Sequence, residues 1–153
     1  MTAESGSHGV IGFGYEGTDQ AAFVTSLARS GVGLLVDVRL NAISRKQGFS
    51  KRGLAQALAD SGIGYEHAPE LGNPSWNRAG FSGSDAEVTS ARITYRQLIR
   101  SGKASARIDE IAKAAATGLV AVLCVESDER HCHRYVVLSE VRGRLPHFVR
   151  AVS

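Results

Sequence analysis

Apolar and polar positions along this chain follow the pattern of strands that alternate with helices. The run Val32–Val38 is almost continuously apolar, which is typical of a strand buried on both faces of a parallel sheet. Leu119–Leu123 has the same character. Two shorter strands are expected at Val10–Gly14 and Ile63–His67. The pattern therefore predicts four strands.

Apolar residues at helical spacing separate these strands. The expected helices are Asp19–Ser30, a helix from Ser50 to the Gly62 region, Asp85–Arg100, Ala104–Ala116 and Tyr135–Val141. Strands that alternate with helices form βαβ units with right-handed crossovers. The sequence thus predicts an α/β fold, with a single doubly wound parallel sheet and helices on both faces.

Three segments lack this periodicity. Residues 1–9 are polar and are expected to form a flexible N-terminal leader, which leaves residues 10–153 as a single α/β domain. Pro69–Ser84 is rich in glycine, asparagine, proline and serine, and so long a loop in a compact domain is usually functional or mobile. Pro146–Val152 is expected to be an edge strand.

Composition mainly excludes classes of protein. The net charge of +3, from 18 Lys+Arg and 15 Asp+Glu, permits an anionic small molecule or a nucleic acid as partner and requires neither. No apolar run approaches the ~20 residues of a membrane span, so no membrane partner is expected. Two cysteines and no export signal favour a cytoplasmic protein with reduced thiols. Composition predicts neither a cofactor nor an oligomeric state.

The densest chemistry follows the last apolar run. The segment from Cys124 to Arg134 reads CVESDERHCHR and combines thiols, carboxylates, imidazoles and guanidinium groups in a strand-to-helix turn. Backbone N–H groups at a helix N-terminus can bind an anion. Ligands of open parallel sheets bind beyond the carboxyl ends of the strands. One pocket is therefore expected, lined by Tyr15 or Glu16, Asp37 or Arg39, Glu126 and Arg134.

The favoured interpretation is a hydrolase or transferase that acts on a nucleotide-like or nucleic-acid phosphate-bearing substrate. In it, Arg39, Arg45 and Arg134 hold the anion, Glu126 is the preferred general base and His133 the proton donor. The predicted catalytic residues are Asp37, Glu126, Cys132 and His133. The predicted substrate-binding residues are Tyr15, Glu16, Arg39, Arg45, Glu70, Asn73, Cys124 and Arg134.

Two further expectations concern single residues. Asp37 ends an apolar strand, and burial of an unpaired carboxylate is costly, so Arg39 or Arg134 is expected to pair with it. Cys132 lies where the last helix should begin, next to His133, so its pKa should fall below that of an ordinary thiol. The same position also suits a structural cysteine that accepts backbone hydrogen bonds.

Two other classes of function stay open. One is a cysteine-dependent enzyme, of thiol, sulfur-transfer or redox type, that uses Cys132 or Cys124. The other is a non-catalytic regulator that binds a nucleotide or nucleic acid at the same edge of the sheet. No metal site is predicted, because the chain has no Cys-x-x-Cys pair and structural zinc requires four ligands.

Two features bear on the nucleotide hypothesis. The glycines of Gly12–Gly17 have the spacing of a dinucleotide-binding turn, but Glu16 would repel a pyrophosphate, and a tight turn explains them equally well. The basic segment from Arg39 to Arg52 is either a solvated loop or a phosphate clamp. In the second case, Phe49 and Trp76 would be available to stack on a base.

Five segments carry a wider resemblance, and in chain order they are GYEG at 14–17, VDVR at 36–39, SRKQGFSK at 44–51, PELGNP at 69–74, and Cys124-x-Glu126 with Cys132-His133-Arg134. Together they resemble the bacterial family catalogued as domain of unknown function 488, over about residues 10–143. The resemblance implies a compact α/β sandwich whose motifs form an active site, and it implies no particular reaction. The proline that this family usually carries between Glu126 and Cys132 is absent, which leaves that loop less rigid.

Overall fold

A computed structural model describes residues 8–125 and 131–145 of the chain. These residues contain one four-stranded parallel sheet in the order β1-β4-β2-β3. The strands are β1 (Gly9–Gly14), β2 (Val32–Asp37), β3 (Gly64–His67) and β4 (Leu119–Cys124). The two most apolar segments, β2 and β4, occupy the centre, as their burial on both faces requires.

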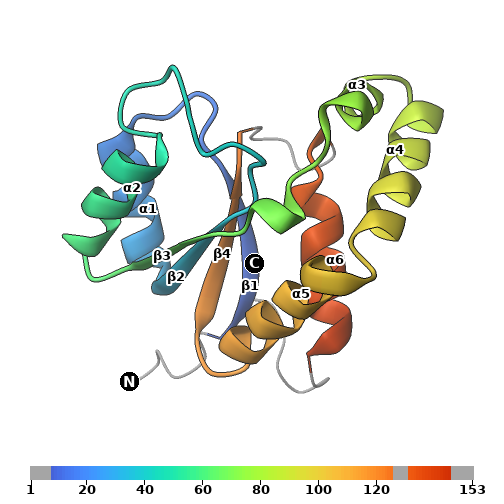
Figure 1. The fold of residues 1–153 in the computed structure, drawn as a ribbon. Helices are drawn as coiled ribbons and strands as arrows, with labels where there is room; N and C mark the ends of the chain where they lie inside the picture. Colours follow the sequence, from blue (N-terminus) through green and yellow to red (C-terminus); the bar gives the residue numbers. More distant parts are fainter. Residues whose placement is uncertain (1–7, 126–130, 146–153) are drawn as a thin grey trace.

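Helices cover both faces of this sheet (Figure 1). On one face lie α1 (Gln20–Ser30) and α2 (Lys51–Ala59), and on the other lie α5 (Gly102–Ala115) and α6 (Arg134–Arg144). A further helix, α4 (Asp85–Leu98), packs against α6. The predicted α/β fold with a parallel sheet between helices is therefore confirmed.

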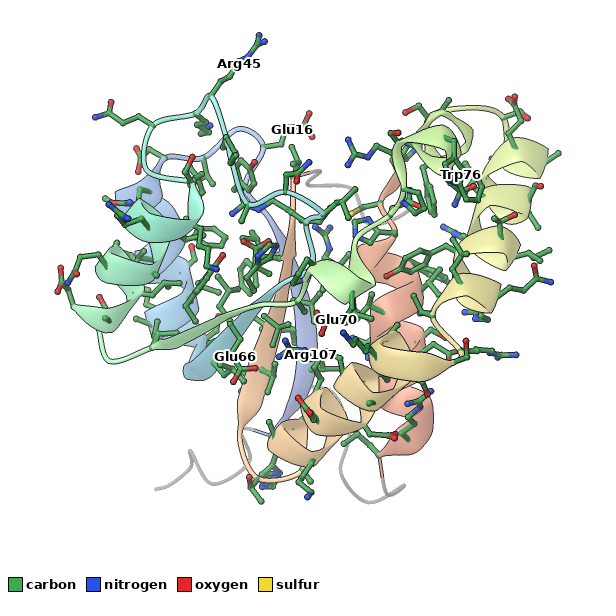
Figure 2. All side chains as sticks on the ribbon, in the orientation of Figure 1. Glu16, Arg45, Glu66, Glu70, Trp76 and Arg107 are labelled. Atoms are coloured by element: carbon green, nitrogen blue, oxygen red, sulfur yellow. The ribbon has the colours of Figure 1, made fainter. Side chains whose placement is uncertain are left out.

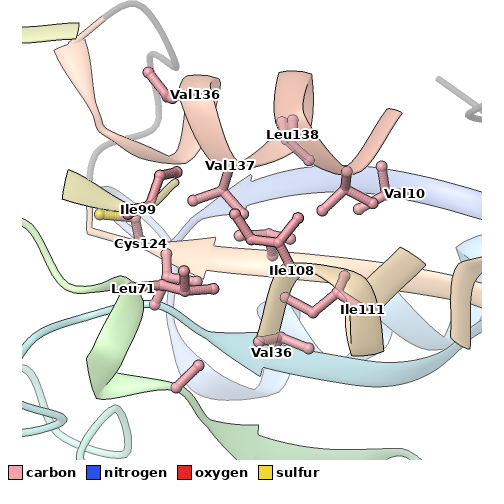
Figure 3. Packing of buried hydrophobic residues seen from close by; sticks show 14 of the residues in the cluster. Val10, Val36, Leu71, Ile99, Ile108, Ile111, Cys124, Val136, Val137 and Leu138 are labelled. Atoms are coloured by element: carbon pink, nitrogen blue, oxygen red, sulfur yellow. The ribbon is translucent and has the colours of Figure 1, made fainter. Parts of the chain in front are cut away.

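The core is divided into two apolar clusters by the alternation of side chains along β4. Leu119, Ala121 and Leu123 belong to the cluster under α1 and α2. Val120, Val122 and Cys124 belong to the cluster under α5 and α6. Figure 3 shows Cys124 at the end of this second cluster. Since successive side chains of a strand point to opposite faces, the thiol of Cys124 is directed towards α6.

Several local predictions need correction. Helix α1 begins at Gln20 and not at Asp19, because Asp19 caps it: its Oδ1 accepts a hydrogen bond of 2.8 Å from the N–H of Ala22. The segment expected to be a loop at Pro69–Ser84 contains three short helical turns, which are η2 (Pro69–Leu71), η3 (Ser75–Asn77) and α3 (Arg78–Phe81). The strand expected at Pro146–Val152 lies outside the described residues, as does most of the expected leader.

None of the helices in residues 8–125 and 131–145 has the length and apolar character needed to cross a bilayer.

Candidate functional site

A pocket of about 540 Å³ lies at the carboxyl edge of the sheet. Its wall is formed by the loop after β2, the segment that follows β3, and the turn between β4 and α6. Of the predicted site residues, five line it: Arg39, Asn73, Cys124, Cys132 and His133. Arg78, Phe81, Ser82 and His131 are also part of the wall. None of the described residues that line the pocket is acidic.

Two thiols and an imidazole meet at the base of this pocket. Cys124 is the last residue of β4, and Cys132 and His133 immediately precede α6. The Nδ1 atom of His133 lies 3.7 Å from the Sγ atom of Cys124 and 3.7 Å from that of Cys132. All three side chains are buried, and neither cysteine forms a disulfide.

The backbone fixes the orientation of His133. Its Nε2 atom lies 2.8 Å from the carbonyl oxygen of Val38. A carbonyl can only accept, so Nε2 carries a proton, and Nδ1 is the ring nitrogen that faces the two sulfurs. Tyr95 packs edge-on against the ring at 5.1 Å, while its hydroxyl donates to the carbonyl of Leu71 at 2.6 Å. Both the tautomer and the rotation of the imidazole are thus set by the fold.

The pKa values of the two thiols shift in opposite directions. A hydrogen bond from Cys132, together with His133 and the backbone of Val125, lowers the pKa of Cys124 well below its ordinary value. Burial acts against this lowering but is outweighed. Burial and the proximity of Cys124 raise the pKa of Cys132. The expectation that the pKa of Cys132 falls below that of an ordinary thiol is therefore wrong. Its Sγ accepts a hydrogen bond of 3.4 Å from the N–H of Arg134, but burial next to a second thiolate outweighs that bond.

Asp37 forms a second buried cluster at the same edge of the sheet. Its side chain is fully buried and accepts from Arg39 twice, from Nε at 2.8 Å and from Nη2 at 2.6 Å. The hydroxyl of Tyr65 donates to the same carboxylate at 2.5 Å. Burial and this bond raise the pKa of Tyr65, which keeps the hydroxyl protonated as a donor. Of the two partners expected for Asp37, the structure therefore provides Arg39.

This pairing removes two predicted roles. The Nη1 atom of Arg39 donates to the carbonyl of Phe49 at 2.6 Å and to the hydroxyl of Tyr15 at 3.3 Å, so every nitrogen of the guanidinium already has a partner. Arg39 cannot serve as an anion clamp while Asp37 neutralises it, and Asp37 cannot serve as a general base. Phe49 is buried and stacked on Tyr15 at 4.4 Å, so it is not available to a base.

The other predicted residues lie away from the pocket wall. Glu16 and Arg45 are exposed on loops (Figure 2). Glu70 accepts from Arg107 of α5 at 3.3 Å, beside Glu66 (Figure 2). Arg134 is only 1 % exposed and belongs to the buried part of α6. These residues follow strands or begin helices at the correct edge, but the sequence does not reveal which side of the sheet each one faces.

The expectation of one shared pocket is thus only partly met. The turn after β1 does lie beside the turn after β4, since the N–H of Glu16 donates to the carbonyl of Val125 at 2.9 Å. However, Tyr15, Glu16 and Asp37 do not line the pocket, and neither does Arg134. Glu126, the preferred general base, lies outside the described residues.

The glycine-rich turn is accounted for by backbone geometry. Gly17 has φ +83°, a left-handed conformation that glycine adopts without strain. The N-terminus of α1 is already capped by the carboxylate of Asp19. A pyrophosphate there would meet this negative charge as well as Glu16, so the turn does not favour a dinucleotide.

Sequence reasoning missed Tyr65 and Tyr95, which support the two clusters. Tyr65 pairs with Leu35 in the β2–β3 register, two positions before the residue that pairs with Asp37. A tyrosine in a short polar strand next to a buried carboxylate was a signal that could have identified it. Tyr95 follows Val88 and Ala91 at helical spacing, which indicates burial but does not reveal its contact with His133.

Comparison with known protein families matches residues 19–141 to the family described as domain of unknown function DUF488. The matched segment contains both cysteines and His133. Comparisons with curated proteins and with solved structures give no match. Because the family match covers well over half of the sequence, this chain belongs to the family described as domain of unknown function DUF488.

Proposed function

We propose that this protein is a cysteine-dependent enzyme in which Cys124 is the nucleophile and His133 its base. One observation carries the proposal. The Cys124 sulfur lies 3.7 Å from a histidine nitrogen whose ring is oriented by a backbone carbonyl, at the wall of a pocket. The Cys132 sulfur lies at the same distance, and the lowered pKa of Cys124 favours Cys124 as the nucleophile. An activated cysteine has this arrangement, in which a base lies next to the nucleophile and an acceptor orients the base. This favours thiol chemistry over a reaction that begins at a carboxylate.

The proposed reaction has two steps. Nδ1 of His133 takes the thiol proton of Cys124, and the sulfur attacks an electrophilic atom of the substrate. A bond forms between sulfur and substrate while the bond to the leaving group breaks, and the leaving group departs with its electron pair and the proton from His133. Water or an acceptor molecule then releases the substrate fragment and restores the thiol. Release by water makes the overall reaction a hydrolysis, and release to an acceptor molecule makes it a group transfer.

The composition of the pocket wall supports an anionic small molecule as substrate. Arg78 lines the pocket and donates from Nε to the backbone carbonyl of Asn73 at 3.3 Å, and His131 lies in the same wall. A volume of about 540 Å³ suits a small molecule. A nucleic acid is less well supported, because Phe49 is buried and Arg45 lies outside the pocket wall. Two cysteines that form no disulfide with each other are typical of a reducing compartment, so the proposal includes a cytoplasmic location.

Alkylation of single-cysteine variants tests the choice of nucleophile. Cys132→Ser leaves Cys124 as the sole thiol, and Cys124→Ser leaves Cys132. With a chelator present at pH 7, we expect iodoacetamide to modify Cys132→Ser protein at least about fivefold faster than Cys124→Ser protein, because only Cys124 has a lowered pKa. Intact-mass spectrometry gives the rates. In urea the two variants should react equally; equal rates in the folded protein, or faster reaction of Cys132, would refute the assignment.

A charged reagent tests the substrate class. The measured quantity is the ratio of the rate with anionic iodoacetate to the rate with neutral iodoacetamide. This ratio should be higher for folded Cys132→Ser protein than for the unfolded chain, because the pocket wall is basic. Arg78→Ala should lower this ratio about fivefold, which corresponds to a Coulomb effect of about 1 kcal/mol. Arg45→Ala is the matched control, since it removes an exposed arginine outside the pocket wall. An identical ratio in both variants would exclude Arg78 as an anion-binding residue.

A further inference from the structure

Cys124, Cys132 and His133 also have the composition and spacing of a metal site. One ligand atom from each lies within 4.8 Å of the others, and all three residues are buried. Tetrahedral zinc with Zn–S of about 2.3 Å and Zn–N of about 2.0 Å holds its ligand atoms about 3.5–3.8 Å apart. Both sulfur-to-nitrogen distances in this cluster are 3.7 Å. Both sulfur-to-nitrogen distances therefore match the spacing of ligands around a tetrahedral ion.

Hydrogen bonds already orient the ligand atoms. His133 donates from Nε2 to the Val38 carbonyl, and histidines that bind metals usually donate their second nitrogen in this way. The N–H of Arg134 points to the sulfur of Cys132. These bonds direct one nitrogen lone pair and one sulfur towards a common centre.

We infer that Cys124, Cys132 and His133 bind Zn²⁺ or a divalent cation of similar softness, and that none of the described residues fills the fourth coordination position, which faces the pocket. Thiolate and imidazole are the ligand types that zinc prefers. Three protein ligands with one open position are typical of zinc that meets a substrate or solvent, whereas structural zinc is closed by four. Both cysteines bind the ion as thiolates, so that their two negative charges balance its two positive charges.

The sequence places ligand types at all three positions, but no metal site was expected from it, because the two cysteines are eight positions apart and no Cys-x-x-Cys pair exists. The fold removes that objection. Cys124 ends a strand and Cys132 precedes a helix that packs on the same face of the sheet, so both sulfurs reach the one imidazole. The metal ligands come from two elements and not from one short loop.

Occupancy would also regulate the proposed chemistry. A bound cation engages the Cys124 sulfur and the Nδ1 lone pair of His133, which are the two groups that the nucleophilic attack requires. Zinc is therefore expected to inhibit the thiol reaction. This consequence rests on the proposed function, whereas metal binding itself does not.

Cobalt provides the test, because Co²⁺ reports its ligands in its absorption spectrum. Full-length protein, reduced and freed of metal, is titrated with Co²⁺ without oxygen. We expect one equivalent to produce a thiolate-to-cobalt charge-transfer band and the intense visible bands of tetrahedral coordination, and Zn²⁺ to abolish both. Cys124→Ser, Cys132→Ser and His133→Asn should each weaken binding by at least about 100-fold. His8→Asn, which removes a histidine near the opposite end of β1, is the control and should bind as the wild type does.

Each outcome decides the inference. A weak octahedral cobalt spectrum without a thiolate band in the wild-type protein would overturn it, and this readout does not depend on whether a variant folds. Undiminished binding by Cys124→Ser protein with a native circular dichroism spectrum would also overturn it. Failure of the proposed function looks different, because the cobalt bands would then appear while metal-free Cys124 reacts no faster than Cys132. Reactive Cys124 without cobalt bands would leave the proposed function standing and remove the metal site.

Discussion

Asp37→Asn is expected to lower the free energy of unfolding by about 3–5 kcal/mol, because it leaves the Arg39 guanidinium buried without its counter-ion. Asp37 is fully buried and Arg39 is 4 % exposed, so water cannot replace the lost carboxylate. The carboxylate also accepts from the N–H of Arg39 at 3.1 Å and from Tyr65, and an amide cannot accept from all of these donors. Removal of one partner from a buried pair costs far more than the pair itself contributes.

Tyr65→Phe is the matched control for this prediction. It removes one hydrogen bond to the same carboxylate and keeps both charges, so a smaller loss of about 1.5–3 kcal/mol is expected. Urea denaturation of the wild type and both variants gives the free energies. A loss below about 1 kcal/mol in Asp37→Asn, or an equal loss in the two variants, would show that the Asp37–Arg39 pair is not the stabilising feature described here.

This buried pair illustrates what the sequence could predict. An acid at the end of an apolar strand is costly to bury alone, so the need for an arginine partner follows from Asp37 itself. That Arg39 fills this role, and is therefore lost as an anion-binding group, depends on the path of the loop after β2. The carbonyl of Phe49 and the hydroxyl of Tyr15 complete the set of acceptors, and no periodic pattern encodes these distant contacts.

The sheet was more accessible to prediction than the site, because burial leaves a periodic signal. The apolar runs of β2 and β4 give the central strands directly, and the rule for parallel sheets gives the edge at which polar groups gather. The side of the sheet at which each group lies depends on the pleat. Asp37 packs with Tyr65 under α2, whereas Cys124 lies under α6, so residues from one edge form two separate clusters.

The ranking of the two cysteines failed for a related reason. Proximity to a helix N-terminus favours a thiolate at Cys132, and the sequence shows that proximity. It does not show that Cys124 lies next to Cys132, or that both thiols are buried around one imidazole. Two adjacent thiols cannot both ionise easily, so the charge goes to the sulfur that receives more hydrogen bonds, which is Cys124.

Cys132→Ala is expected to lower the thiolate fraction of Cys124, at pH values below its pKa, by about 10–100-fold relative to Cys132→Ser. The hydrogen bond from Cys132 is the largest effect that lowers the pKa of Cys124. Serine retains a hydroxyl donor at this position, whereas alanine has none, and a hydrogen bond to a charged group contributes about 1.5–3 kcal/mol. Both variants contain Cys124 as their only thiol, so the comparison needs no correction for a second site.

The pH dependence shows whether this effect operates through ionisation. Alkylation proceeds through the thiolate, so its rate rises with pH and levels off above the pKa. A lowered pKa moves this rise to lower pH, so the serine variant should react faster near neutrality, while the two variants converge in alkaline solution. Rates measured from pH 5 to pH 10 in the presence of a chelator provide the profile. Parallel curves with a constant ratio at every pH would show that alanine changes access to Cys124 and not its ionisation, and the hydrogen bond from Cys132 would then have no part in activating the nucleophile.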